Sequence, residues 1–596
     1  MDNIVASGWR GDGGSAAVNA TTVAAAQFAP VHGDVAANLT LIRALLERGA
    51  ASGAGLVVFP ELATTGYAWV SAGEVAPFAE PVPGPVTDWL TERCREYGCH
   101  VVLGLVERAG RPLYNTAVLV GPAGLVGRYR KAKLWSWDTL WATAGDKPPA
   151  VWPTPVGRIG ALICADLDYP EGTSWLARAG ADLVAVPTCW SDEPAPSPVW
   201  RARAHDSAIP FAVANVSGTE RGVTFAAGSC VIGEDGRLLD RVAGGQGLAV
   251  ATVDLSAGRR RRADRAGGLM SAGSEAFEAL DRNAQLFPSS QTPGMSTRTR
   301  PVAPVRVAVV QGSAEGTAEA SLTALAGRLT ATGAARERPA LAVLPALLAP
   351  DLAADPRLLS RLAQACGRHA PTEFVVSVLD ERSGRTTVLL TRGGTVVTSV
   401  TVSPAGVRTG DGAPLRPVLR AWGAVGLLTA AELLRPEPAR CLAVNGSDLI
   451  AVTGRLSGPP VEAPAVGGAP PFDLWRVRAG ENNCYLAVAN ATLPDGSGGW
   501  SGLHGPAYYD QHAARVTLNG TEERAASLAL TLDPAIPVGR LVADKPLLAQ
   551  RRPELYGSAC PRGSVLAPGG EPTRRPLPGT RVASPGRARR ASPAHP

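Results

Sequence analysis

Three residues in the first half of the chain could together carry covalent chemistry. Glu61 stands in the run PELATTGY, Lys131 in YRKAKL and Cys164 in GRIGALICADLDYPE. A thiol is a weak nucleophile until it is deprotonated, so it needs a base within hydrogen-bond reach. A carboxylate can be that base, and a lysine supplies positive charge where an oxyanion develops. The three residue types therefore suit acyl transfer through a thioester.

Each of these residues lies at or near the end of a predicted strand. The apolar run LVVF precedes Glu61, the strand-like NTAVLVGPAG precedes the polar run around Lys131, and another apolar run ends at Cys164. Open α/β folds place ligand sites at the carboxyl ends of their strands. We therefore expect the three side chains to lie close together.

The chain contains two blocks, about 21–256 and 303–556, that look like copies of one another. Strand-like runs recur in the same order: TVAAAQ ending at Gln27 and VRVAVVQ ending at Gln311, LVVFPEL and LAVLPAL, ADLVAVP and SDLIAVT, PFAVAN and CYLAVAN. Short apolar strands that alternate with helix-like segments predict an α/β fold. Two further pairs, NLTLIRALLERGAASGA with ASLTALAGRLTATGA and VGRIGALICADLDYPE with WGAVGLLTAAELLRPE, bring the matching segments to six in one order, which favours a tandem duplication.

The second block lacks the three chemical groups. In the internal alignment Glu61 corresponds to Ala346, Lys131 to about Thr401 and Cys164 to Ala430. Without the thiol, thioester chemistry is impossible there. We therefore expect the second block to be structural, shaping the entrance of the site or holding a partner.

Composition and charge limit the function classes. With 45% hydrophobic and 18% charged residues, the 596-residue chain can bury large cores. Residues 551–596 carry nine Arg and two Glu, which leaves residues 1–550 with a net charge of −1. This favours a solvated basic tail over a nucleic-acid surface. The expected domains are a frayed 1–20, a catalytic 21–256, a linker 257–302, a degenerate 303–556 and a disordered Pro/Arg-rich 557–596.

The sequence also gives an expected location. No run approaches the roughly 18 apolar residues of a membrane span, and the first residues lack a basic start followed by an apolar stretch. The nine cysteines are scattered, with no CxxC pair. We therefore expect a cytoplasmic protein with no disulfide framework, no zinc site and no membrane partner.

The three motifs, with separations of 70 and 33 residues, resemble the catalytic blocks of the nitrilase superfamily, the carbon–nitrogen hydrolases. Gln27 and Asn215 also match the family pattern. The resemblance covers about 21–256 and implies a four-layer αββα sandwich without a metal or organic cofactor. It implies Glu61 as general base, Lys131 as stabiliser of the tetrahedral intermediate and Cys164 as nucleophile.

Further site residues follow from the same resemblance. The backbone N–H of Ala165 would complete the oxyanion hole with Lys131. Asp138 precedes WATAGDKP where the family usually has Glu, so it has either a supporting role or a loop-capping role. Tyr67, Trp135 and Trp190 are expected to line the substrate pocket. Family members commonly pair across one face, so the two halves could form an internal pseudo-dimer, or the chain a homo-oligomer.

The resemblance leaves several functions open. The run Cys164-Ala165-Asp166 favours an amidase or carbamoylase over a nitrilase, since nitrilases tend to have Trp-Glu after the cysteine. A glutaminase that delivers ammonia would need a separate synthetase, because no SGGxDS or GxxxxGK[ST] loop is present. An N-acyltransferase of the lipoprotein type would need membrane helices. A scaffold protein would fit the second block only. The expected reaction is hydrolysis of a small linear amide or N-carbamoyl compound.

Overall fold

The first half is built on two six-stranded sheets that face each other. In the computed structural model the first sheet has the order β14-β1-β2-β3-β4-β5, with β1, β2 and β3 parallel. The second has the order β13-β12-β9-β8-β7-β6, with β7, β8 and β9 parallel. The strands of the first sheet are β1 (Ala20–Gln27), β2 (Leu56–Val58), β3 (His100–Arg108), β4 (Leu113–Gly121), β5 (Gly124–Arg130) and β14 (Gly247–Asp254). Those of the second are β6 (Val151–Thr154), β7 (Gly157–Ala161), β8 (Leu183–Thr188), β9 (Phe211–Asn215), β12 (Cys230–Ile232) and β13 (Leu238–Arg241).

The structure describes residues 19–269, 303–331, 338–457, 473–505, 515–517, 526–532 and 551–556, apart from 192–193, 314, 405 and 412–413. The expected frayed start, most of the expected linker and the expected basic tail lie outside these residues. The described part of that linker continues helix α6 (Leu255–Leu269). None of the described helices is long and apolar enough to cross a bilayer.

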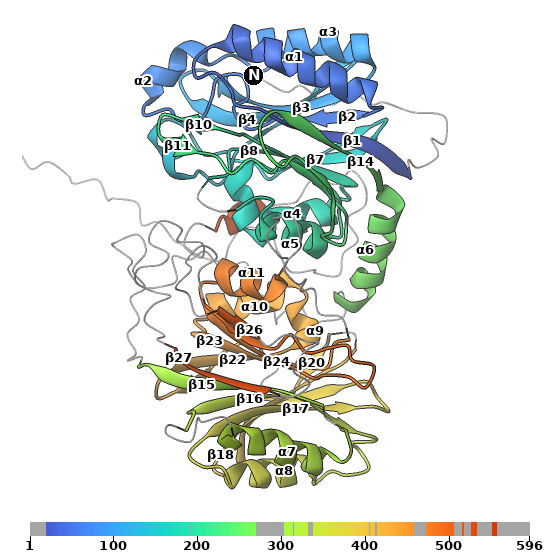
Figure 1. The fold of residues 1–596 in the computed structure, drawn as a ribbon, viewed down its shortest axis with the longest axis vertical. Helices are drawn as coiled ribbons and strands as arrows, with labels where there is room; N and C mark the ends of the chain where they lie inside the picture. The colour runs from blue at the N-terminus through green and yellow to red at the C-terminus, as the bar shows by residue number, and fades with distance from the viewer. Residues whose placement is uncertain are drawn as a thin grey trace, which may run out of the picture. The chain divides into compact units, whose positions relative to one another are not determined.

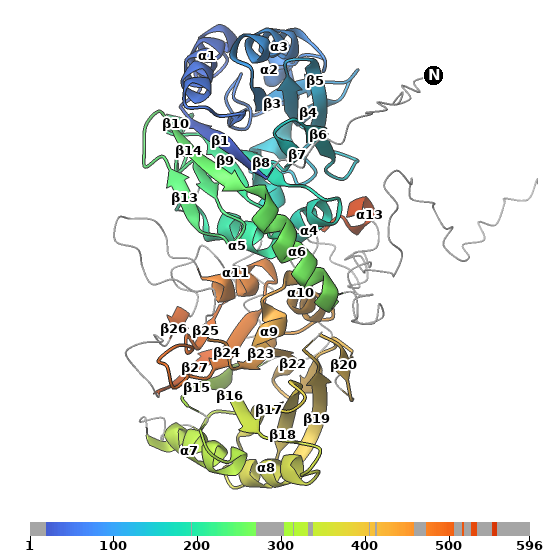
Figure 2. The same ribbon diagram turned by 90° about the vertical axis from the view of Figure 1, so that its right-hand side faces the viewer.

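Helices cover the outer faces of both sheets, as Figures 1 and 2 show. Helices α1 (Val35–Ala51) and α3 (Pro85–Tyr97) lie on the first sheet, and α4 (Pro170–Arg178) and α5 (Pro198–Ser207) on the second. Helix α1 begins because the Asp34 side chain accepts from the Ala37 N–H. It then buries Ile42, Leu45 and Leu46, which share one face. The αββα expectation is thus confirmed for the first half.

The second half has the same layers and the same strand order. Its sheets run β20-β19-β18-β17-β16-β15-β27 and β21-β22-β23-β24-β25-β26. The strands are β15 (Val305–Gln311), β16 (Leu341–Ala349), β17 (Glu373–Asp380), β18 (Thr386–Arg392), β19 (Thr395–Val402), β20 (Arg408–Thr409), β21 (Val418–Arg420), β22 (Gly423–Thr429), β23 (Leu449–Gly454), β24 (Tyr485–Asn490), β25 (Gly502–His504), β26 (Arg515–Thr517) and β27 (Ala526–Leu532). The helices are α7 (Ala318–Ala331), α8 (Leu358–Gly367), α9 (Ala430–Leu433), α10 (Pro436–Val444), α11 (Leu474–Glu481) and α13 (Pro553–Tyr556).

One hydrogen-bonded latch joins the two sheets of the first half. Gln27, at the end of β1, accepts from the Ser229 N–H at 2.9 Å, and the Ser229 hydroxyl accepts from the Asn215 N–H at 2.8 Å. The Asn215 side chain in turn accepts from the Trp190 N–H at 2.7 Å. All of these polar groups are buried, so each needs its partner.

The second half contains the same latch. Gln311 accepts from the Ser501 N–H at 3.0 Å, and Ser501 accepts from the Asn490 N–H at 3.0 Å. Asn490 accepts from the Leu456 N–H at 2.7 Å. The matching strand order and latch agree with a duplication, which stays an interpretation.

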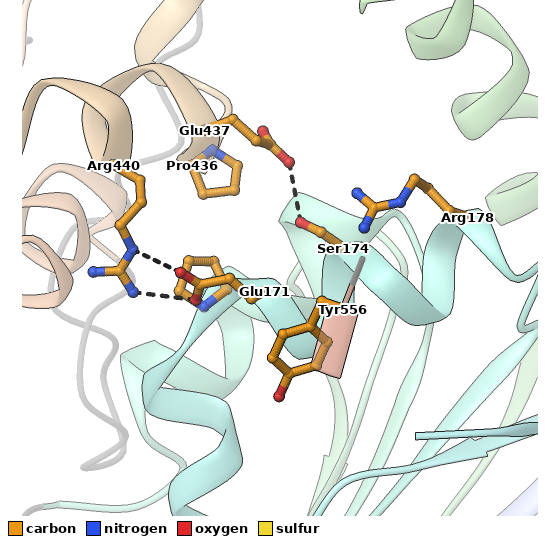
Figure 3. Close-up of a pocket in the computed structure, with 8 residues that line it drawn as sticks. Glu171, Ser174, Arg178, Pro436, Glu437, Arg440 and Tyr556 are labelled. Carbon is orange, nitrogen blue, oxygen red and sulfur yellow. Dashed lines mark hydrogen bonds and ion pairs between the residues drawn. The ribbon is translucent and has the colours of Figure 1, made fainter. Parts of the chain in front are cut away.

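Helices α5 and α11 meet through a buried cluster of four charges. Arg203 contacts Glu481 at 2.6 Å, and Arg478 contacts Asp206 at 2.5 Å. The two helices share the pattern W-R-x-R-A-x-[DE], so each arginine meets the acid of the other helix. Helices α4 and α10 show the same reciprocity, because Glu171 contacts Arg440 and Ser174 donates to Glu437 (Figure 3). Reciprocal contacts of this kind are the mark of a two-fold interface.

We expect Arg478→Met to weaken the contact between the halves strongly. The change leaves two buried carboxylates with only Arg203 as a cation, and breaking such a buried pair costs about 3–5 kcal/mol. Urea unfolding followed by tryptophan fluorescence measures the loss. The exposed Arg361, which pairs with Asp355 and Glu319, provides the control, since Arg361→Met should leave the midpoint nearly unchanged. Equal midpoints for both variants would contradict the prediction.

Candidate active site

Glu61 lies on a tight turn that follows β2. The backbone leaves the sheet after the Phe59 N–H donates to Val102, and Leu62 has a φ of 48°. Gly104 on β3 makes this approach possible, because a Cβ there would lie 2.6 Å from the Glu61 Cα. Glu61 is fully buried. The sequence therefore places its carboxylate inside the sandwich and not in a solvated loop.

Three donors hold the Glu61 carboxylate. Lys131 Nζ lies 2.6 Å and Asn115 Nδ2 2.7 Å from Oε1, and the Cys189 N–H lies 2.8 Å from Oε2. Burial raises the pKa of Glu61 above its ordinary value. The positive charge of Lys131 opposes this rise, and the negative charge of Asp138 adds to it. The raised pKa makes the Glu61 carboxylate a stronger base than an exposed glutamate.

Lys131 follows β5, a strand that the sequence analysis read as a polar run. Its ammonium contacts Glu61 and, at 2.5 Å, Asp138 Oδ2. Burial alone would lower the pKa of Lys131, but Asp138 and Glu61 outweigh it and raise that pKa well above its ordinary value. The ammonium therefore keeps its charge throughout any working pH range.

Asp138 has both of the contacts that its two expected roles require. It lies in the 3₁₀ turn η2 (Ser136–Leu140) and is fully buried. Its Oδ2 accepts from the Trp135 N–H at 3.1 Å, which caps the turn, and Oδ1 accepts from Asn115 at 3.0 Å. Together with the Lys131 contact, these bonds make Asp138 part of one buried polar cluster with Glu61.

Cys164 begins the 3₁₀ turn η3 (Cys164–Asp168), directly after the end of β7. Its φ of 45° lies in the left-handed region, where a non-glycine residue is strained. Burial raises the pKa of the Cys164 thiol, and the Glu61 carboxylate raises it further, whereas Lys131, Thr188 and the Cys189 N–H act the other way. At rest the sulfur is therefore a thiol that needs a base.

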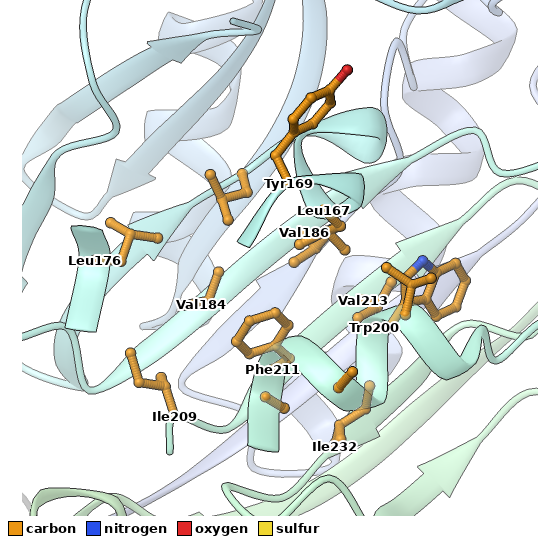
Figure 4. Packing of buried hydrophobic residues seen from close by; sticks show 14 of the residues in the cluster. Leu167, Tyr169, Leu176, Val184, Val186, Trp200, Ile209, Phe211, Val213 and Ile232 are labelled. Atoms are coloured by element: carbon orange, nitrogen blue, oxygen red, sulfur yellow. The ribbon is translucent and has the colours of Figure 1, made fainter. Parts of the chain in front are cut away.

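The turn that carries Cys164 is fixed by Asp166. Its carboxylate accepts from the Ile163 N–H, the Tyr129 hydroxyl and the Lys133 N–H, each at 3.0 Å. Burial raises the pKa of Asp166 to about 6 despite these donors. Below the turn, Leu167 and Tyr169 pack into the apolar cluster over β8 and β9 (Figure 4). Asp166 therefore links the lysine segment to the cysteine segment.

The expected pocket residues divide into two groups. The Tyr67 ring lies 5.9 Å from Lys131 Nζ, and its hydroxyl donates to the Trp135 carbonyl at 3.3 Å. Trp190 instead belongs to the main core, where it meets Trp200 edge-on at 5.5 Å. The apolar cluster around Tyr67 contains Trp69, Trp141, Cys189, Val216 and Phe225.

Several contributors were missed or underrated in the sequence. Asn115, which joins Glu61 to Asp138, lies inside a strand-like run with no motif around it. Cys189 also holds Glu61, because its N–H and thiol donate to the Glu61 carboxylate and carbonyl. Cys230 is buried in β12. The oxyanion role of the buried Ala165 stays a prediction.

The corresponding region of the second half is filled differently. Ala346, the counterpart of Glu61, lies inside strand β16, and Ala430, the counterpart of Cys164, begins α9 directly after β22. The hydroxyls of Ser377 and Thr453, one from each sheet, meet at 2.6 Å. Thr401, the counterpart of Lys131, meets the Thr387 hydroxyl at 2.8 Å across the sheet.

The described residues contain no group of three or more His, Cys, Asp or Glu side chains placed to hold a metal ion. The eight cysteines among the described residues are buried and form no disulfide. The expectation of no cofactor stays a prediction.

Comparisons with known proteins find relatives of the first half of the chain. The carbon-nitrogen hydrolase family matches residues 22–263. A nitrilase of Pyrococcus abyssi is 33% identical over 38% of this chain and 86% of its own length. An (R)-stereoselective amidase of a Pseudomonas species is 34% identical over 40% of this chain and 86% of its own. Among solved structures, an amidase from Nesterenkonia sp. AN1 is 29% identical over 41% of this chain and 97% of its own, with a TM-score of 0.36.

The fold and the site thus define a class of hydrolases with a buried carboxylate, ammonium and thiol. The chain belongs to the carbon-nitrogen hydrolase family. It acts on carbon–nitrogen bonds other than peptide bonds.

We expect Asp138→Asn to shift the acid limb of the pH profile of kcat/KM downward. Glu61 must be ionised to accept a proton, and its raised pKa places that limb above pH 4.5. The Asp138 charge contributes to the rise, so its removal should move the limb to lower pH. The profile of the exposed Asp88→Asn variant should match the wild type. A limb that stays in place or moves up in Asp138→Asn would count against the assignment.

Proposed function

We propose that the first half hydrolyses a small linear amide or N-carbamoyl compound through a thioester on Cys164. The observation that carries this proposal is the buried contact between Lys131 and Glu61 beside the strained turn of Cys164. A permanent cation, a base with a raised pKa and an unionised thiol are the three groups that acyl transfer needs.

The proposed reaction has two stages. Glu61 takes the thiol proton as the Cys164 sulfur attacks the carbonyl carbon, and Lys131 and the Ala165 N–H stabilise the oxyanion. The proton passes from Glu61 to the leaving nitrogen, the carbon–nitrogen bond breaks, and ammonia or an amine departs. Glu61 then takes a proton from water, which attacks the thioester. The carbon–sulfur bond breaks, and the proton returns to the sulfur.

An amide is favoured over a nitrile as the substrate. The small Ala165 and the acidic Asp166 after the nucleophile differ from the Trp-Glu run that nitrilases tend to have. The relatives include proteins named both nitrilase and amidase, so nitrile hydrolysis is the alternative. The apolar cluster around Tyr67 supports a substrate with an uncharged acyl group. A glutaminase that supplies a separate synthetase is the further alternative.

The second half is proposed to be a degenerate copy that pairs with the first inside one chain. The reciprocal contacts between α5 and α11 and between α4 and α10 support this pseudo-dimer. Its three changed positions leave it without thioester chemistry. A cytoplasmic location, inferred from the cysteine pattern, stays a prediction.

Ammonia release tests the proposed reaction. The purified chain is offered small aliphatic amides, N-carbamoyl amines and amino acids, nitriles and glutamine. We expect release from one class, and Cys164→Ala should lower kcat at least about 10³-fold, because no other group can form the thioester. Cys230→Ala, which removes a buried thiol in β12, should keep its activity.

Two outcomes would contradict the proposal. Turnover that survives in Cys164→Ala would place the chemistry elsewhere, for instance in the second half. Release from glutamine alone would favour the glutaminase alternative.

A further inference from the structure

A short segment near the C-terminus lies on the first half, although it follows the strands of the second. This segment, Arg551–Tyr556, is called the clip below. Arg551 is 3% exposed and Tyr556 is 2% exposed. Tyr556 and Leu555 belong to the same apolar cluster as Ile163 and Cys164. The clip therefore packs into the buried core, next to helix α4.

One arm of the clip contacts the helix that follows Cys164. Arg551 Nε lies 2.6 Å from Glu171 Oε1. Glu171 stands in the first turn of α4, which begins two residues after η3 ends. Arg440 of the second half contacts the same carboxylate at 3.2 Å. Burial alone would raise the pKa of Glu171, but the two arginines outweigh it and lower that pKa, so the contact stays ionic.

The other arm contacts the segment that follows Lys131. The Lys133 ammonium lies 5.7 Å from the centre of the Tyr556 ring and 4.7 Å from that of Tyr169. Figure 3 shows Tyr556 beside Glu171 and Ser174 at the start of α4. Arg552 donates to the Gly145 carbonyl at 3.5 Å, and the Gly145 N–H donates to the Lys131 carbonyl at 2.8 Å.

We propose that the clip is a positioning element of the active site, by which the second half holds the lysine segment against the cysteine segment. The clip bridges these segments on one side, at Glu171, Lys133 and Gly145. Asp166 bridges them on the other, through the Lys133 N–H and the Ile163 N–H. Arg551 contacts Glu171 and Tyr556 contacts Lys133, and neither Glu171 nor Lys133 is a reacting group. The clip acts by fixing the distance between Lys131 Nζ and the Cys164 sulfur.

This arrangement gives the inactive half a part in the reaction. A displacement of about 1 Å between catalytic groups can cost about 100-fold in rate. The lysine segment leads into the turn η2, and the cysteine segment forms the turn η3. Each turn depends on contacts with neighbouring segments to stay in place. The proposal rests on the proposed function for its effect on turnover, but its effect on Cys164 can be measured without a substrate.

Two truncated chains that differ only by the clip test the proposal. One ends at residue 556 and the other at residue 550. We expect the chain that ends at 556 to match the full chain. Loss of the clip should lower kcat about 10- to 100-fold, with a much smaller change in KM. Iodoacetamide alkylation of Cys164, followed by mass spectrometry at fixed pH, should slow, because Lys131 no longer favours the thiolate.

Single variants separate positioning from folding. Arg551→Ala should reproduce the loss in kcat and in alkylation rate, and Arg551→Lys should restore part of both, since a cation again meets Glu171. Circular dichroism reports whether each chain is folded. If the chain ending at 550 is unfolded, Arg551→Ala decides the question.

Three results would overturn the proposal. Unchanged kcat and alkylation in folded Arg551→Ala would show that the clip is only a surface contact. Faster alkylation would show that it shields Cys164 and does not position Lys131. Equal losses in Arg551→Ala and Arg551→Lys would remove the ionic contact as the cause. If no amide is hydrolysed by the full chain, the proposed function fails, while the alkylation rates still test the clip.

Discussion

The structure of the first half depends on one buried cluster of charges, the Lys131 ammonium between the carboxylates of Glu61 and Asp138. Charged groups taken out of water lose several kcal/mol each unless ion pairs and hydrogen bonds replace the solvent. Asn115 and the N–H groups of Cys189 and Trp135 supply those bonds. They come from both sheets and from the η2 turn. The sandwich must therefore close correctly before the cluster is satisfied, which couples folding to the geometry of the site.

The hydrogen-bonded latch differs from this charge cluster because it occurs in both halves. Gln27 and Asn215 match a family pattern, which on its own invites a catalytic interpretation. Their counterparts Gln311 and Asn490 form the same bonds in the second half, where thiol and carboxylate are absent. A feature that occurs without the chemistry is a requirement of the fold. The latch fixes the sheets at one edge, and in the first half it also orders the segment whose Cys189 N–H holds Glu61.

The sequence predicted the residues whose types are chemically unusual for their places, and it missed those that act through backbone geometry. Glu61 after an apolar strand, Lys131 and Cys164 could be identified because their types and separations form motifs. Asn115 was missed because a single amide inside a strand has no motif. The backbone N–H of Cys189 has no sequence signal at all.

Trp190 was placed in the pocket because loop tryptophans near a site suggest a wall, but its ring turns toward Trp200 in the core. Strand β5 was missed because its glycines and arginines give the segment a composition typical of a loop.

The contact between the halves ties the surface of the first half to the helices of the second. Buried apolar residues of α4 and α5 share one cluster with those of α10 and α11. Arg203 and Asp206 are buried in the same region, where their counter-charges come from α11. Without this cover the first half would expose apolar surface, and Arg203 and Asp206 on α5 would keep only each other as counter-charges. Selection on the first site therefore also acts on the helices of the second half.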